Sequence, residues 1–314
     1  GVKMKKLSVL GSANGDLYVE VNKLPLIGET IQAHAGGELR AGGKGANQAA
    51  AASLLGGSTF FLGQVGNDAA GGMLKSELSS RGVNIENINT LSDTPSGQAI
   101  IILLTTGDNS IIIIGGANMR WSSLSESIIN TIINCDALLL QREIPDEINI
   151  QAAKLAKENG KIVIMDTGGK EGELPNELLE NIDILSPNTT ELERLTGIQN
   201  DIVQASEKLF KIGVKHLVVK LGSEGSLYLG GNGRYEQRAL SDPELSIIDT
   251  TGAGDCFTAA LAVKLLERGN LNLEDFADSM KFASAAAFLS ITKKGALESM
   301  PTRDAVEAFL TKFQ

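Results

Sequence analysis

The sequence is poor in cysteine, histidine and aromatic side chains, and each shortage excludes a class of protein. It has only two cysteines, Cys135 and Cys256, which are too few for a disulfide framework or a zinc site of their own. The two histidines, His34 and His216, are too isolated to predict metal binding or acid–base catalysis. Low cysteine usage is typical of a reducing compartment, so we expect a soluble, cytoplasmic protein.

Long hydrophobic runs are also missing. No apolar run approaches the ~18 residues of a transmembrane helix, and the longest, Ala99–Leu104, has the length of a buried strand. The first residue is Gly1 and not an initiator methionine, which indicates either a cleaved tag or a removed targeting segment. A removed transit peptide would place the chain in an organelle stroma, such as that of a chloroplast.

Positive charge is in short supply, because 28 Lys and Arg residues face 38 Asp and Glu residues, giving a net charge of −10. An acidic chain is a poor general binder of nucleic acid or anionic membrane, so we expect neither as a partner. A local site for an anionic substrate is still compatible with this charge, since backbone amides bind phosphate without net positive charge.

What the sequence does have is glycine, at 35 residues, and aliphatic runs that alternate with helical periodicity. The expected strands are Leu7–Leu10, Thr59–Val65, Ile100–Leu104, Ala137–Leu140, Ile162–Met165, Ile182–Leu185 and Leu217–Val219. The expected helices are Ala69–Leu78, Leu124–Ile133, Glu147–Glu158, Glu191–Leu195, Ala205–Ile212, Gly254–Glu267, Leu273–Ser290 and Thr302–Phe313. Continuous apolar strands separated by helices predict a doubly wound, three-layer α/β/α sandwich with a mostly parallel sheet.

One stretch breaks this rhythm. Leu17–Leu39 has no helical pattern; residues 18–21 and 30–33 alternate around a turn at Pro25–Gly28. Ile100–Leu104 and Ser110–Ile114, joined by Gly107-Asp108, can pair with it. We therefore expect a small β-sheet lid, built from about 15–40 and about 97–116, over the open end of the parallel sheet.

The first candidate site is the run Gly42-Gly43-Lys44-Gly45-Ala46-Asn47, which leads directly into an alanine-rich helix. It is not a P-loop, because Gly45 stands where that motif needs Ser or Thr after the lysine. The run is compatible with a plain turn and helix start. Three glycines beside a lysine and an asparagine favour contact with a small polar ligand.

The second candidate site is Asp249-Thr250-Thr251-Gly252-Ala253-Gly254-Asp255, again at the start of a helix. Consecutive amides at Gly252, Ala253 and Gly254 predict an anion cradle. Asp255 could simply stabilise the helix N-terminus. A carboxylate beside an anion cradle is also what phosphoryl transfer needs, because it can take a proton from a hydroxyl as phosphate arrives.

Together these two runs resemble the signature regions of the ribokinase-like carbohydrate kinases of the phosphofructokinase-B type. The likeness extends to Gly11–Asp16, Ser186–Glu191, Lys220–Gly225 and Lys293–Ala296, in the family's order and over nearly the whole chain. The resemblance implies one kinase domain over residues 1–314, with the β lid as its appendage. It also implies an ATP-dependent kinase that phosphorylates the 5-hydroxyl of D-ribose.

The resemblance further implies a role for individual residues. Asp255 would be the general base, with Gly252, Ala253 and Gly254 as the anion hole. The sugar would be bound, besides Asp255, by Asn14, Asp16, Gly42, Gly43, Lys44, Asn47 and Glu143. ATP would be bound by Asn188, Lys220, Gly222, Ser223, Gly225, Gly254 and Ser284.

Two cations and a dimer are implied in the same way. Glu191 would act on magnesium through water. A potassium ion would be held by Asp249, Thr251, Ser290, Lys293, Gly295 and Ser299. The lids of two subunits would pair edge to edge into a homodimer.

Two alternatives stay open. The same reaction on fructose, deoxyribose or a nucleoside would differ only in the pocket, although few aromatics are available to support a nucleoside base. A non-catalytic sugar- or nucleotide-binding regulator on this fold is the other alternative. Such a protein is expected to have lost the base or a cradle glycine, yet Asp255, Gly252 and Gly254 are all present.

Overall fold

The computed structural model describes residues 3–314, which form a large central sheet, a small second sheet and the helices that cover the large one. The large sheet has nine strands in the order β13-β12-β11-β10-β9-β8-β1-β4-β5. Neighbours from β5 to β11 are parallel, and β12 and β13 continue as an antiparallel hairpin. The strands are β1 (Lys6–Leu10), β4 (Ser58–Gly66), β5 (Ile88–Leu91), β8 (Ala137–Leu140), β9 (Ile162–Asp166), β10 (Ile184–Ser186), β11 (His216–Lys220), β12 (Ser226–Gly230) and β13 (Gly233–Gln237).

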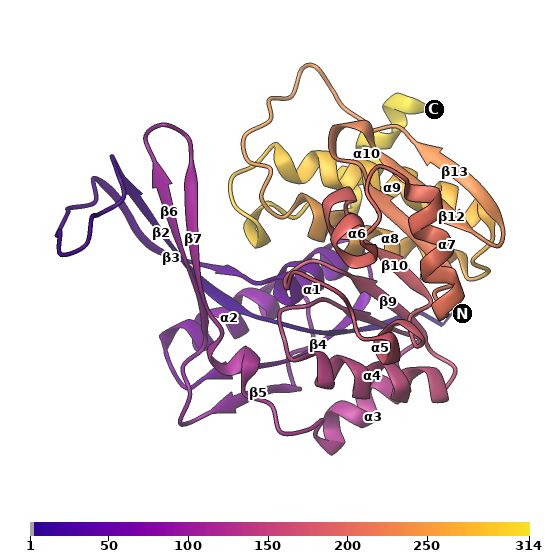
Figure 1. Cartoon of the computed structure of the whole chain (residues 1–314), viewed down its shortest axis with the longest axis horizontal. Coiled ribbons are helices and arrows are strands. Elements are labelled where there is room, and N and C mark those ends of the chain that lie inside the picture. The colour runs from indigo at the N-terminus through magenta and orange to yellow at the C-terminus, as the bar shows by residue number, and fades with distance from the viewer. Residues whose placement is uncertain (1–2) are drawn as a thin grey trace.

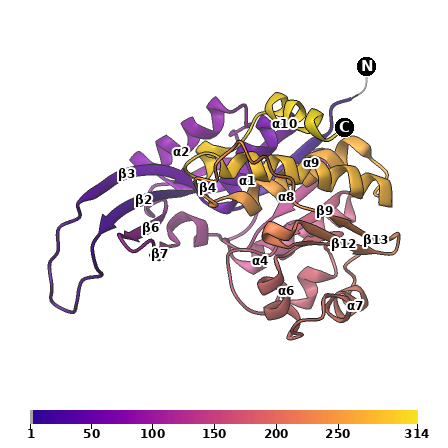
Figure 2. The ribbon, with the colours of Figure 1, turned by 90° about the horizontal axis from the view of Figure 1, so that it is seen from above.

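Helices cover both faces of this sheet, as Figure 2 shows. One face carries α1 (Lys44–Leu54), α2 (Ala69–Ser80), α8 (Ala253–Arg268), α9 (Leu273–Ile291) and α10 (Arg303–Leu310). The other carries α3 (Glu126–Asn134), α4 (Asp146–Glu158), α5 (Asn176–Leu179), α6 (Thr189–Thr196) and α7 (Ile202–Ile212). Short 3₁₀ turns are η1 (Gly116–Met119), η2 (Gly222–Glu224), η3 (Leu297–Ser299) and η4 (Thr311–Phe313).

The strand sequences explain why both faces of the sheet are buried. Along β8, Ala137 and Leu139 pack into the core on the α8 side, whereas Leu138 and Leu140 pack into the core on the α4 side. Because successive side chains of a strand point to opposite faces, an all-apolar strand is stable only when both faces are covered. The predicted three-layer α/β/α sandwich is confirmed.

The small sheet stands out from the body as an arm (Figure 1). Its order is β3-β2-β6-β7, with β2 (Asn14–Val21), β3 (Ala35–Gly42), β6 (Gly97–Leu104) and β7 (Asn109–Ile114). The antiparallel β6–β7 pair and the strand character of residues 18–21 agree with the sequence. The return strand is a correction, because residues 30–33 lie in an exposed loop and β3 begins only at Ala35.

Other differences from the sequence expectation are local. The β12–β13 hairpin and β5 were not predicted, and the last helix ends at Leu310 before a 3₁₀ turn. No helix within residues 3–314 is long and apolar enough to cross a membrane. The parallel strands all present their carboxyl ends at one edge of the sheet, where the starts of α1 and α8 also lie, so this edge is where a site is expected.

Candidate active site

The backbone at the start of α1 packs closely against the segment that follows β1. Ala46 N donates to the Ser12 carbonyl at 2.8 Å, and a Cβ on Gly45 would lie 2.6 Å from Ser12 N. Gly43 has φ 90°, and a Cβ there would lie 2.9 Å from Asn14 N. Glycine is therefore required for this close approach, which brings Lys44 and Asn47 next to the residues after β1.

Asp255, in the first turn of α8, joins this helix to the start of α1. Its side chain is buried, and Asn47 Nδ2 donates to its Oδ2 at 3.0 Å while Gln48 Nε2 donates to its Oδ1 at 3.0 Å. Lys44 Nζ lies 3.6 Å from Oδ1. Asp255 raises the pKa of Lys44 above its usual range, against the effect of burial, so the lysine is charged. The three predicted residues Lys44, Asn47 and Asp255 thus meet in space.

The predicted cradle precedes Asp255. Gly252 has φ 80° and caps α8, and a Cβ there would lie 3.1 Å from Ala296. Ala253 and Gly254 begin the helix, where backbone N–H groups have no acceptor within the helix. Both residues line a cavity of about 560 Å³. The positive end of the α8 dipole therefore faces this cavity, as an anion site requires.

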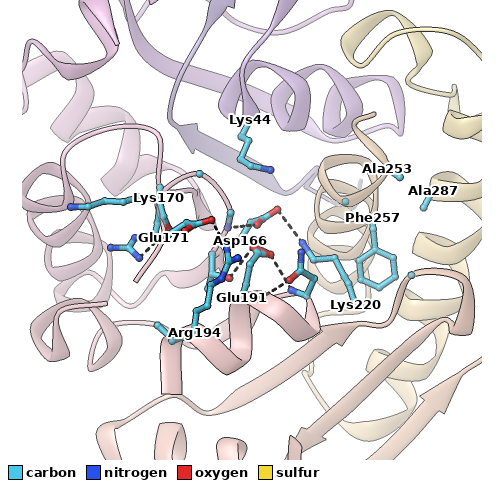
Figure 3. Close-up of a pocket in the computed structure, with 18 of the residues that line it drawn as sticks. Lys44, Asp166, Lys170, Glu171, Glu191, Arg194, Lys220, Ala253, Phe257 and Ala287 are labelled. Carbon is cyan, nitrogen blue, oxygen red and sulfur yellow. Dashed lines mark hydrogen bonds and ion pairs between the residues drawn. The ribbon is translucent and has the colours of Figure 1, made fainter. Parts of the chain in front are cut away.

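Figure 3 shows the cavity, with Lys44, Lys220 and Ala253 on its walls. The predicted nucleotide residues Asn188, Lys220, Gly222, Gly225 and Gly254 also line it, together with Glu191. Two predicted residues do not belong to its lining. Ser223 is exposed in the η2 turn, and Ser284 is buried in α9, where its hydroxyl accepts a hydrogen bond from Leu240 N at 3.0 Å.

Asn188 and Glu191 form a reciprocal cap at the start of α6. Asn188 Oδ1 accepts from Glu191 N at 2.7 Å, and Glu191 Oε1 accepts from Asn188 N at 3.1 Å. Glu191 Oε2 lies 3.5 Å from Thr167 Oγ1 at the cavity wall. One carboxylate oxygen therefore serves the helix while the other faces the cavity, so the capping role does not exclude a ligand role.

The predicted sugar residues gather around the start of β2. Asn14 Oδ1 accepts from Asn118 Nδ2 at 2.7 Å. Glu143 accepts hydrogen bonds from the Ser12 hydroxyl and, at 2.9 Å, from Lys44 N. Burial, with a contribution from Glu143, raises the pKa of Asp16 to about 7. Gly42 lies against the Asp16 carboxyl group, because a Cβ on Gly42 would lie 2.0 Å from Asp16 Oδ2.

The predicted potassium residues lie behind the cradle. Asp249 Oδ1 accepts from Thr251 N, and its Oδ2 accepts from Gly295 N, both at 2.9 Å. Burial acts to raise the pKa of Asp249, but these hydrogen bonds outweigh it and hold the pKa below its usual value. The side chains of Ser290 and Ser299 are turned to backbone carbonyls of Ala287 and Ala296. Within residues 3–314, no cluster of three or more His, Cys, Asp or Glu residues forms a metal site.

Sequence reasoning missed two side chains at the centre of the site, Gln48 and Asp166. Asp166 ends β9, and its Oδ2 accepts from Gln48 Nε2 at 2.9 Å and from Lys220 Nζ at 3.1 Å. Burial acts to raise the pKa of Asp166, but Lys220 and Lys44 overcome it and lower the pKa. The signal for Asp166 was a polar residue followed by Thr167-Gly168-Gly169 directly after a buried strand.

Comparison with known proteins places this geometry in a family. The family model described as "pfkB family carbohydrate kinase" matches residues 4–303. The chain is 47% identical to a ribokinase of Arabidopsis thaliana, over 96% of this chain and 79% of that protein, and 36% identical to a ribokinase of Haemophilus influenzae, over 98% of both.

Solved structures agree. The structure of the Arabidopsis thaliana ribokinase complexed with ribose and ATP superposes with a TM-score of 0.92 at 45% identity, covering 98% of this chain and 99% of that one. A ribokinase from Thermotoga maritima gives a TM-score of 0.86 at 34% identity, covering 98% and 100%. The family model and the relatives match nearly the whole chain, and the structure places the buried carboxylate of Asp255 beside the predicted anion cradle. We conclude that this chain belongs to the pfkB family of carbohydrate kinases.

Proposed function

We propose that this chain transfers the γ-phosphoryl group of ATP to the 5-hydroxyl of D-ribose. The observation that carries the proposal is the position of Asp255, between the sugar residues of α1 and the cradle Gly252–Gly254. Ribose and ATP are the ligands of the solved relative at 45% identity, which supports the same pair here.

Asp255 supplies the base. Three donors, from Lys44, Asn47 and Gln48, face its two oxygens and fix the orientation of the carboxylate. A base in this position accepts the sugar proton late, once the bond to phosphorus has begun to form. The cradle amides of Ala253 and Gly254 then stabilise the negative charge on the transferring group.

The cavity of about 560 Å³ is the place for the nucleotide, with its magnesium as part of the substrate. Its size is in the range of small-molecule sites. Asn188, Gly222 and Gly225 line it, Ser223 lies in the adjoining η2 turn, and Glu191 presents one carboxylate oxygen towards it. An oxygen ligand that acts through water suits magnesium, which keeps much of its hydration.

Sugar selectivity rests on polar groups in a small space. Asn14, Asp16 and Glu143 offer oxygens to several hydroxyls, and the absence of a side chain at Gly42 and Gly43 lets the backbone approach Asp16 and Asn14 closely. Because these groups pay a desolvation cost when left unpaired, a substrate lacking a matching hydroxyl is bound poorly. This arrangement supports ribose over deoxyribose, which lacks one hydroxyl.

A potassium ion fits the oxygens behind the cradle. Asp249 contributes a single carboxylate, and the other proposed donors, Thr251, Ser290, Lys293, Gly295 and Ser299, would contribute neutral oxygens. With one negative charge among neutral oxygens, the ligand charge is low for a tightly held divalent cation, and a monovalent cation is the better match. When bound, the ion would fix the backbone that leads into Gly252.

The small sheet supports two further parts of the proposal, a lid and a dimer. The four consecutive isoleucines Ile111–Ile114 of the edge strand β7 are 54%, 52%, 60% and 40% exposed. An exposed apolar edge strand is a template for pairing with another chain. Pairing of two such sheets would cover these side chains and hold the lid over the sugar.

The experiment is a coupled assay of ADP formation over a panel of ribose, deoxyribose, fructose and adenosine, with the 5-phosphate identified by mass and NMR. We expect turnover with ribose at the highest kcat/KM. Higher kcat/KM with another member of the panel would overturn the ribose assignment, and no sugar-dependent ADP formation would overturn the kinase.

A further inference from the structure

Lys220 sits at a junction that connects the nucleotide cavity to the base. It ends β11, and its ammonium donates to Asp166 Oδ2 at 3.1 Å and to Thr258 Oγ1 at 3.0 Å. Thr258 lies one turn after Asp255 on α8, so both side chains belong to one face of that helix. Figure 3 shows Lys220 extended across the cavity floor towards Asp166.

The ammonium group of Lys220 has a hydrogen-bond donor left over. Lysine has three N–H donors, and Asp166 and Thr258 take two of them, with no third acceptor in residues 3–314. Lys220 lines the cavity, and its Nζ lies 3.8 Å from the position of a Cβ on Gly254, which is the last residue of the cradle. The unused donor is therefore next to the amides that receive the phosphoryl group.

Asp166 also reaches the base through a single amide. Gln48 Nε2 donates to Asp166 Oδ2 at 2.9 Å and to Asp255 Oδ1 at 3.0 Å, so the two hydrogens of one NH₂ group join the two carboxylates. Gln141 Nε2 donates to Gln48 Oε1 at 2.7 Å, which fixes the orientation of this amide. Base and lysine are thus positioned by one buried network.

Two ion pairs flank the cradle before reaction. Lys44 pairs with Asp255 and Lys220 pairs with Asp166, giving two ammonium groups and two carboxylates. When Asp255 takes the sugar proton, one negative charge disappears and both ammonium groups remain. The surplus positive charge arises only as the phosphoryl group moves, and only such transition-state interactions raise kcat.

We propose that Lys220 is a catalytic residue that contacts the transferring phosphoryl group, and that Asp166 is the positioning residue that holds it. This inference rests on the proposed function, since it assigns Lys220 a role within that reaction. It adds a second cation to Lys44, which lines the same cavity and is paired with Asp255. Phosphate oxygens are suitable acceptors for the unused ammonium donor.

The test compares Lys220→Met, Asp166→Asn and the double variant in steady-state kinetics of the full chain. We expect Lys220→Met to lower kcat about 10²-fold, the scale of one lost oxyanion donor, with the KM for ribose within about threefold. Asp166→Asn should lower kcat about tenfold, and the double variant should be no slower than Lys220→Met, because both act through one group.

Lys157→Met is the matched control, because it removes one of the two lysines, Lys157 and Lys215, that pair with another largely buried carboxylate, Asp183, outside the site. It should cost stability without lowering kcat. The double variant removes both buried charges together, so it decides the question if Lys220→Met alone fails to fold.

A folded Lys220→Met or double variant with kcat within twofold of the unaltered chain would overturn the proposal. Fully additive losses in the double variant, or a loss confined to the KM for ribose, would overturn it as well. These outcomes differ from failure of the proposed function, in which the unaltered chain itself forms no ribose-dependent ADP.

Discussion

Asn47 Nδ2 donates a 3.0 Å hydrogen bond to Asp255 Oδ2 across 208 positions of sequence. The bond joins the start of α1 to the start of α8, which are the two glycine-rich helix starts of the chain. The residues proposed to bind the sugar belong to the first, and the proposed phosphate cradle belongs to the second. Under the proposed function, the contact brings the two halves of a phosphoryl transfer within reach of one carboxylate.

Gly252 and Gly269 give a matched pair at the two ends of α8, with φ of 80° and 86°. Alanine at either pays about 1–2 kcal/mol for the left-handed conformation. Only at Gly252 would the new Cβ press on Ala296, at 3.1 Å. We expect Gly252→Ala to lower kcat about tenfold or more, and Gly269→Ala to lower only the melting temperature. An equal kcat in the two variants would show that Gly252 has no role in phosphoryl transfer.

Potassium should activate the enzyme through Asp249. Replacing potassium by sodium or a bulky organic cation should lower kcat/KM about 5–150-fold, the usual range for two coupled sites. Asp249→Asn removes the one carboxylate of the proposed cation site and should abolish the difference between the salts. A full potassium response in Asp249→Asn would place the cation elsewhere.

Asp16 should make the sugar-free protein less stable as pH rises. Its pKa is about 7 when folded, against 3.8 as the ordinary value, because of burial and Glu143. A raised carboxyl pKa contributes stability that is fully present below pH ~4 and is lost as pH rises to ~7. We expect Asp16→Asn to gain stability over the unaltered chain across that window, by about 2–4 kcal/mol at pH 8. Urea unfolding at pH 5 and 8 measures this, and a pH-independent difference would refute it.

The dimer should depend on β7. Ile113→Lys places a charge on the exposed edge of the small sheet, where it would be buried in the proposed pair. Sedimentation should show monomer for Ile113→Lys and dimer for Val203→Lys, a comparably exposed position on α7. A dimer in both variants would exclude this edge as the contact.

Much of the fold was predictable because local patterns coincide with tertiary burial. Ala137–Leu140 is apolar at every position, and the structure buries both of its faces. The β12–β13 hairpin was missed although Asn232-Gly233 is a turn signal, because its strands are short and mixed in polarity. The return strand β3 was placed too early because the alternation of residues 30–33 has no packing partner.

The site was predictable where its residues stand in glycine-rich motifs at helix starts, as Lys44 and Asp255 do. Gln48 and Asp166 do not stand at the glycine-rich helix starts, although Gly168 and Gly169 follow Asp166, and the contact between them spans 118 positions. Ser284 stays a prediction for the adenine side, although its hydroxyl is engaged by Leu240 N.

The most direct measurement is the turnover of ribose by Asp255→Asn. The substitution keeps the shape of the side chain but removes the base that Lys44, Asn47 and Gln48 surround. We expect kcat to fall about 10²–10⁴-fold, the usual scale for a general base, while calorimetry shows ribose binding within about threefold of the unaltered chain. Turnover within twofold of the unaltered chain would contradict the account.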